Sequence, residues 1–67
     1  RLGELEEAEN TLRRAMSIKD DPEVVAHLAE VLVKRGKAVD ARKLIANSLG
    51  KNPGNSVLQA AQARLLP

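Results

Sequence analysis

The residues best suited to chemistry lie close together, between positions 23 and 30. His27 is the one histidine of the chain, and Glu23 and Glu30 lie four residues before it and three residues after it. On a helix these offsets bring side chains to one face, where an imidazole and two carboxylates can bind a metal ion. Such a site needs three or four well-placed ligands, and the chain has no cysteine to complete one. We therefore interpret His27 as a surface histidine and predict no metal site.

Other patterns of catalytic residues are missing from the sequence. Ser17, Ser48 and Ser56 have no residue beside them that could act as a general base. The glycines do not follow the GxxxxGK[ST] spacing of a phosphate-binding loop. The sequence therefore predicts no enzymatic activity and no cofactor.

Length and composition indicate one small domain. A chain of 67 residues buries only about 60% of the surface that its unfolded form exposes, so a single core is expected. Phe, Tyr, Trp and Cys are absent, so that core must be built from Leu, Val, Ile, Ala and Met. Without cysteine, the sequence does not identify a compartment. No apolar run reaches the roughly 18 residues that a membrane span needs, and a chain that begins at Arg1 is expected to be a fragment or a processed form.

The charge balance does not predict nucleic-acid binding. The formal net charge is +2, and no aromatic side chain is present to stack on bases. One segment is strongly basic and is opposed only by Asp40; its cations are Lys34, Arg35, Lys37, Arg42 and Lys43. We interpret these side chains as exposed to solvent on a turn and an outer helix face. Association with an acidic partner or with nucleic acid is the alternative, and a binding assay at moderate salt distinguishes the two.

Four helical segments are expected to position these residues, and the first runs from Glu4 to Ile18. Its apolar residues recur every three or four positions and so form one stripe: Leu5, Ala8, Leu12, Ala15 and Met16. Glutamates crowd its N-terminal end at positions 4, 6, 7 and 9, where the helix dipole favours negative charge. We interpret these glutamates as a solvated face, with Glu9 and Arg13 forming a pair that contributes roughly a few tenths of a kcal/mol.

The second segment, from Pro22 to Arg35, has the widest apolar surface. An aspartate before it is expected to cap exposed backbone N–H groups, with Pro22 at the first helical position, where its missing N–H does no harm. Its apolar residues occupy more than one face, so we expect neighbours on two sides; they are Val24, Val25, Ala26, Leu28, Ala29, Val31 and Leu32. Gly36 is expected to end the helix by adopting positive φ.

The third segment runs from Ala38 to Leu49 and repeats the apolar stripe. The stripe consists of Ala38, Ala41, Leu44, Ile45, Ser48 and Leu49. Gly50 is expected to close this helix, because glycine accommodates the backbone conformation of a helix C-terminus. Residues 51–55 contain Asn, Pro and Gly and are expected to form a turn.

The fourth segment runs from Ser56 to Leu66 and has one apolar and one polar side. Ser56 or Asn55 can cap its N-terminus, and Gln59 is placed to complete a capping box with Ser56. We expect Pro67 to end the helix. The mixture of sides is typical of a last helix with one face packed and the other in water.

An internal repeat links the segments in pairs. Gly3 and Gly36 occupy equivalent positions, and the offset between them carries the apolar stripe of the first helix onto that of the third. The same offset pairs the second helix with the fourth, through Val25 with Leu58, Leu28 with Ala61 and Leu32 with Leu65. A helical period in the low thirties predicts a solenoid in which no hairpin covers its apolar face alone. Small residues on the stripes are expected to mark close helix crossings: Ala8, Ala29, Ala41 and Ser48.

The pattern resembles the tetratricopeptide repeat family over nearly the whole chain. The matching residues of the complete unit are Leu28, Ala29, Leu32, Gly36, Ala41, Ile45, Ser48 and Pro53, and those of the preceding half-unit are Leu2, Gly3, Ala8, Leu12 and Ala15. The large aromatic residues usual in these repeats are absent, and the link around residues 20–22 is irregular in length.

This resemblance implies an all-α fold of about four helices, in which antiparallel helical hairpins stack as a right-handed solenoid. It implies a single domain over residues 1–67, with 1–20 as the second half of one repeat and 22–55 as one complete repeat. Residues 56–67 are then a C-terminal capping helix, and the chain is expected to be the C-terminal fragment of a longer array.

Members of this family bind partners in a concave groove that is lined by successive first helices and receives an extended peptide or a helix. The resemblance carries this surface onto Glu23, Ala26, His27, Glu30, Val33 and Lys34. Some such grooves hold a terminal carboxylate with Lys and Asn, but here Glu30 would repel it. The chain is therefore expected to be a non-catalytic protein–protein interaction module. Three alternatives stay open: self-association, a structural spacer in a larger scaffold, and a solvated surface on which Glu30 and Lys34 merely pair.

Overall fold

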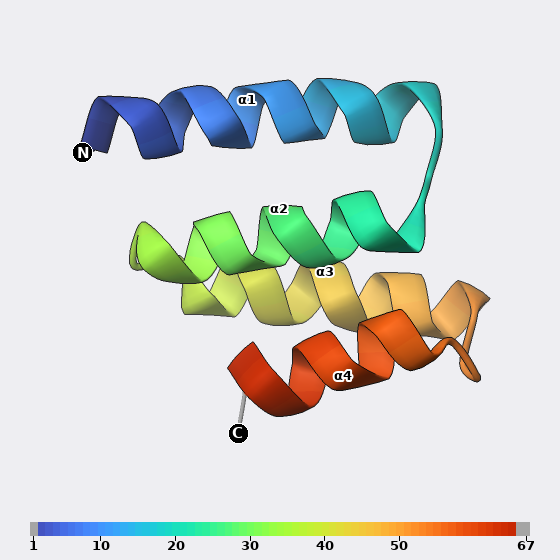
Figure 1. Ribbon diagram of the computed structural model, residues 1–67. Helices are drawn as coiled ribbons and strands as arrows, with labels where there is room; N and C mark the ends of the chain where they lie inside the picture. The colour runs from blue at the N-terminus through green and yellow to red at the C-terminus, as the bar shows by residue number, and fades with distance from the viewer. Residues whose placement is uncertain (1, 66–67) are drawn as a thin grey trace.

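The computed structural model describes residues 2–65, and this part of the chain contains four α-helices and no strands. They are α1 (Leu2–Ile18), α2 (Pro22–Lys34), α3 (Ala38–Lys51) and α4 (Ser56–Leu65), and consecutive helices run in opposite directions (Figure 1). The prediction of an all-helical chain of antiparallel hairpins is confirmed. The expected end of the last helix at Leu66 and Pro67 lies outside the described residues.

The helix α2 is the element that the other three share. It contacts α1, α3 and α4, whereas the backbone of α1 approaches neither α3 nor α4 within the described residues. The overall extents are 34 × 28 × 15 Å, which is a flat shape. In a closed four-helix bundle each helix has neighbours on two sides around one axis. The helices here form an open array instead, and one side of α2 stays accessible.

The core lies where α2 meets α3 and α4. It contains the large aliphatic side chains expected from the sequence, each at most 1% exposed: Val25, Leu28, Leu32, Ile45 and Leu58. By contrast, all five residues of the α1 stripe are only half-buried, from Leu5 to Met16. The reason is that α1 has α2 alone as a helical neighbour.

Both ends of α2 form as the sequence predicts. The Oδ1 atom of Asp21 accepts a hydrogen bond from the backbone N–H of Glu23 at 2.9 Å, and Pro22 occupies the first helical position. At the other end Gly36 has φ of +79°. The N–H of Lys37 donates to the carbonyl of Leu32 at 2.8 Å and that of Gly36 to Val33 at 3.0 Å. This pair of bonds is a Schellman motif, which requires the positive φ that glycine adopts easily.

Two local predictions are wrong. Gly50 does not close α3, because the helix continues to Lys51 and stops before Pro53, whose ring disfavours helical backbone in the preceding residue. Gln59 does not complete a capping box with Ser56. The cap of α4 is Asn55, whose Oδ1 accepts from the N–H of Leu58 at 3.1 Å, while the Gln59 amide donates to the carbonyl of Pro53 at 2.9 Å.

The small residues divide into two groups. Ala29 and Ala41 are 0% exposed and Ser48 is 6% exposed, as expected for helices that cross closely. Ala8 is only half-buried and lines an open hollow on α1, so a close helix crossing at Ala8 stays a prediction. The sequence alone could not distinguish these two degrees of burial, because the stripe positions are equivalent and only the number of neighbouring helices differs.

Candidate functional site

A hollow lies between α2 and α4, and we call it the α2/α4 groove. Its lining residues come from one face of each helix: Glu23, Ala26 and His27 of α2, and Val57, Ala60, Ala61 and Arg64 of α4. In both helices they are spaced by three and four residues, so each helix presents one continuous stripe to the groove. The two helices pack directly against each other, which holds the stripes side by side.

The groove has an apolar floor and a polar rim. Ala26 is 6% exposed and Ala61 is 2% exposed, so both lie at the bottom, while Val57 is accessible at the side. Glu23, His27 and Arg64 are exposed. A floor of methyl groups lets another side chain approach closely, and the rim supplies groups that can pair with charge. This arrangement suits binding by contact and charge pairing.

Only part of the surface expected from the sequence lies in this groove. Glu23, Ala26 and His27 line it together, but Glu30, Val33 and Lys34 do not. Glu30 is half-buried, Lys34 is exposed, and Val33 packs against the core. Glu30 and Lys34 form no ion pair within the part of the chain that the structure describes, so the expected pairing of these two side chains is wrong, while the solvated surface stays an alternative.

The wall contributed by α4 was not predicted. The sequence does contain a repeat that relates the two groove walls. Its offset, seen between the helix starts Pro22 and Ser56, is one position longer than the offset from Gly3 to Gly36. The capping residues Asp21 and Asn55 have the same separation as these helix starts. At the longer offset the α2 lining residues coincide with Val57, Ala60 and Ala61. The pairing taken from the sequence matches the buried faces of the two helices, where Val25 and Leu58 are at most 1% exposed. It does not match the faces that line the groove.

The strongest electrostatic feature lies away from the groove, around Glu9. This side chain is only 7% exposed, and its carboxylate accepts hydrogen bonds from Arg13 Nε at 2.9 Å, Arg35 Nη1 at 2.6 Å and Lys37 Nζ at 3.3 Å. The bond from Arg13, together with those from Arg35 and Lys37, lowers the pKa of Glu9 to about 2, although burial acts in the opposite direction.

The Glu9 cluster joins three parts of the chain. Arg13 belongs to α1, Arg35 is the cap residue after α2, and Lys37 precedes α3. The interpretation of Glu9 as part of a solvated face is wrong, because its partners 26 and 28 residues away enclose it. Arg35 and Lys37 also belonged to the basic segment of the sequence. Since both contact Glu9, they are engaged within the chain.

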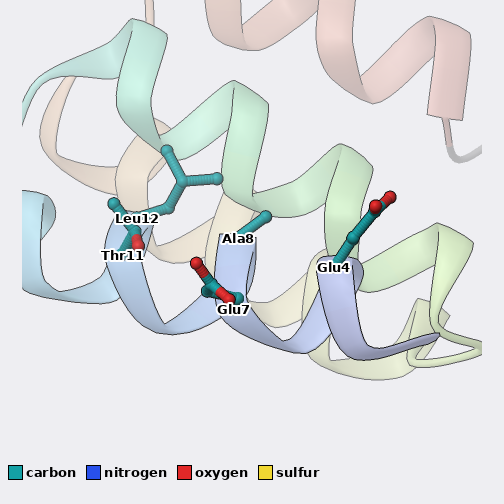
Figure 2. Close-up of a pocket in the computed structure, with 5 residues that line it drawn as sticks. All are labelled: Glu4, Glu7, Ala8, Thr11 and Leu12. Atoms are coloured by element: carbon teal, nitrogen blue, oxygen red, sulfur yellow. The ribbon is translucent and has the colours of Figure 1, made fainter. Parts of the chain in front are cut away.

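A second hollow lies on α1 (Figure 2). It is lined by Glu4, Glu7, Ala8, Thr11 and Leu12, and the figure shows Ala8 and Leu12 directed toward the neighbouring helix. Its apolar contacts come from these two residues of the half-buried α1 stripe. All of its lining residues belong to α1, so this hollow lacks the second wall that α4 gives to the α2/α4 groove.

Metal-ligand and membrane-spanning features are not found in the described residues. Between residues 2 and 65, no three side chains of His, Cys, Asp or Glu come together as metal ligands. None of the four described helices combines the length and hydropathy needed to cross a bilayer.

Comparison with known protein families gives a match to the family described as Tetratricopeptide repeat, over residues 1–65. Comparisons with curated proteins and with solved structures give no match. The family match covers all four helices and therefore both walls of the α2/α4 groove.

Proposed function

Because the chain belongs to the tetratricopeptide repeat family, whose repeats generally mediate protein–protein interaction, we propose that its α2/α4 groove binds a segment of a partner protein. The observation that carries this proposal is the groove itself: a buried alanine floor, exposed charged rims, and walls from two helices that pack against each other. The bound segment is an extended peptide or a helix. We propose no catalytic step at this site.

The repeat boundaries proposed from the sequence agree with this assignment. Residues 22–55 contain α2, the Gly36 turn and α3, and we propose them as the complete repeat. Residues 1–20 contribute the preceding half-repeat, and residues 56–67 are proposed as the capping helix. In this arrangement α2 and α4 are successive first helices, so the groove between them corresponds to the surface expected from the family.

Chemical-shift mapping by NMR tests the proposal. The probe is a peptide enriched from a random peptide library displayed on phage and selected on the whole chain. We expect the largest amide shifts at Ala26, His27, Ala60 and Arg64, with small shifts along α1. Shifts concentrated on α1 or α3, or a library that yields no enriched peptide, would contradict binding in the groove.

Self-association is the second candidate function, and the open hollow on α1 favours it. Ala8 and Leu12 there are half-buried, and a second copy of the chain could cover them. Light scattering over a concentration series distinguishes the candidates. A mass that rises with concentration supports self-association, and a constant monomer mass at all concentrations excludes it as the function of that hollow.

A further inference from the structure

The two walls of the α2/α4 groove carry opposite charge. Glu23 is the charged lining residue of the α2 wall, and Arg64 is the one charged residue of α4. Both side chains are exposed, and neither forms an ion pair within residues 2–65. They therefore do not pair directly across the groove. Each remains available to a charged group of a bound segment.

Between these charges the groove accepts an apolar side chain. Ala26 and Ala61 form the floor, and Ala60 and Val57 add apolar surface above it. At about 340 Å³ the hollow lies near the small end of ligand sites, so it holds one or two side chains and their backbone rather than a folded domain. The absence of aromatic residues from the chain leaves aliphatic contact as the main apolar interaction.

We propose that the groove is specific for a partner segment in which one aliphatic residue is flanked by a basic residue on one side and an acidic residue on the other. This inference rests on the proposed function. The aliphatic residue lies over the alanine floor, the basic residue faces Glu23, and the acidic residue faces Arg64. A segment in the reverse orientation brings like charges together, which costs binding energy, so the two walls also fix the direction of the segment.

The test measures the affinity of an enriched phage-library peptide for four forms of the whole chain by fluorescence anisotropy. They are the natural sequence, Glu23→Gln, Arg64→Gln and the matched control Glu7→Gln, whose exposed glutamate lines the other hollow. We expect enriched peptides to share the charge order described above. Each groove substitution should weaken binding about two- to fivefold, the range of exposed ion pairs, and Glu7→Gln should leave the Kd unchanged. The difference should shrink at high salt.

Peptide variants assign each charge to its wall. Replacing the basic residue of the peptide by Gln should weaken binding to the natural chain but not to the Glu23→Gln variant. Replacing the acidic residue of the peptide by Gln should weaken binding to the natural chain but not to the Arg64→Gln variant. If peptides bind the groove by NMR but their charges do not couple to Glu23 and Arg64, the charge inference is wrong and the proposed function stands.

Three further outcomes would contradict the proposed function as well as the charge inference. Loss of affinity in Glu7→Gln alone places the binding site on α1 and contradicts both the inference and the proposed function. The absence of any enriched peptide contradicts both as well. Concentration-dependent shifts at the groove residues without peptide identify a second copy of the chain as the occupant, and this result contradicts a partner protein.

Discussion

At the scale of single residues, Glu9 concentrates the largest set of charge interactions in the described chain. One carboxylate accepts hydrogen bonds from three cations that come from α1, the end of α2 and the turn before α3. The cations themselves stay partly in water, with side-chain exposures of 47% for Arg13, 21% for Arg35 and 39% for Lys37. Glu9 therefore fixes the position of α1 against the hairpin that follows it.

Replacing Glu9 by Gln should lower the free energy of unfolding by about 1–3 kcal/mol, because three hydrogen bonds to a charged acceptor are lost and Arg35 keeps a partly buried charge. Urea unfolding followed by circular dichroism measures this change. The matched control is Glu7→Gln, an exposed glutamate on the same helix, for which we expect a change within about 0.5 kcal/mol. Equal effects of the two substitutions would contradict the role of Glu9.

The same carboxylate predicts a pH dependence of stability. The pKa of Glu9 is lowered from 4.5 to about 2 on folding, so the folded state binds fewer protons than the unfolded state between these values. Its contribution is fully present above pH 4.5 and is lost as the pH falls toward 2. Urea midpoints measured from neutral pH down to this acid limit should fall more steeply for the natural chain than for Glu9→Gln. Parallel curves for the two proteins would rule out this origin of the acid sensitivity.

At the scale of elements, packing depends on whether a helix has neighbours on one side or on two. Leu28 of α2 is 0% exposed, whereas Leu12 of α1 is half-buried. Leu28→Ala should cost about 2–5 kcal/mol by creating a cavity. The same substitution at Leu12 should cost only about 1–2 kcal/mol, since that side chain already contacts water. Thermal melts of both variants make the comparison, and similar losses would show that α1 is packed as tightly as α2.

The close approach of α3 to its neighbours can be tested by adding volume. Ala41 is 0% exposed, so Ala41→Leu should destabilise the protein by about 1–3 kcal/mol through overpacking. Ala46→Leu is the matched control on the same helix, because Ala46 is exposed and has room for a larger side chain. A thermal melt in which Ala41→Leu loses no stability relative to Ala46→Leu would contradict the placement of Ala41 at a helix crossing.

The sequence predicts the elements well where the signal is local. Asp21 and Pro22 at the start of α2 and Gly36 at its end act through neighbouring backbone atoms, and the structure has them in these roles. The prediction at Gly50 failed because glycine permits a helix end without requiring one. The helix stops where Pro53 enforces it. A permissive residue is thus a weaker signal than a residue that excludes a conformation.

Only the α2 wall of the candidate site was predicted, and the α4 wall was missed for a reason unrelated to helix ends. Glu23, Ala26 and His27 follow from one helix, but the α4 wall depends on how α4 aligns with α2 along the sequence. The offset that pairs Val25 with Leu58 matches the buried faces of the two helices, whereas the groove lining matches one position further along. One position turns a helical residue by about 100°, so the offset of the core does not predict the groove face. The contacts of Glu9 could not be predicted either. Arg35 and Lys37 lie 26 and 28 residues away from it, and such distant pairs do not follow the helical periodicity of the sequence.

At the scale of the whole molecule, the flat array of helices places the large core residues and the charged rim of the groove in different regions. The core forms where α2 meets α3 and α4, while the exposed residues of α2 and α4 form the rim of the groove. Substitutions on that rim should therefore change binding without unfolding the chain. The buried alanines of the groove floor belong to the core, and the charged residues of the rim lie outside it. The proposed function depends on this arrangement, because the rim residues can then be exchanged without opening the core.

The most direct test of this account is the affinity of an enriched peptide for two alanine-to-glutamate variants. Ala60 lines the α2/α4 groove and Ala46 lies on the exposed surface of α3, and both are exposed helical alanines. A glutamate at position 60 obstructs the groove and places a charge against an apolar side chain of the peptide. We predict a Kd weakened by about tenfold or more for Ala60→Glu and a change of less than about twofold for Ala46→Glu, with the fold of both intact by circular dichroism. Equal affinity of the two variants would contradict binding in the groove.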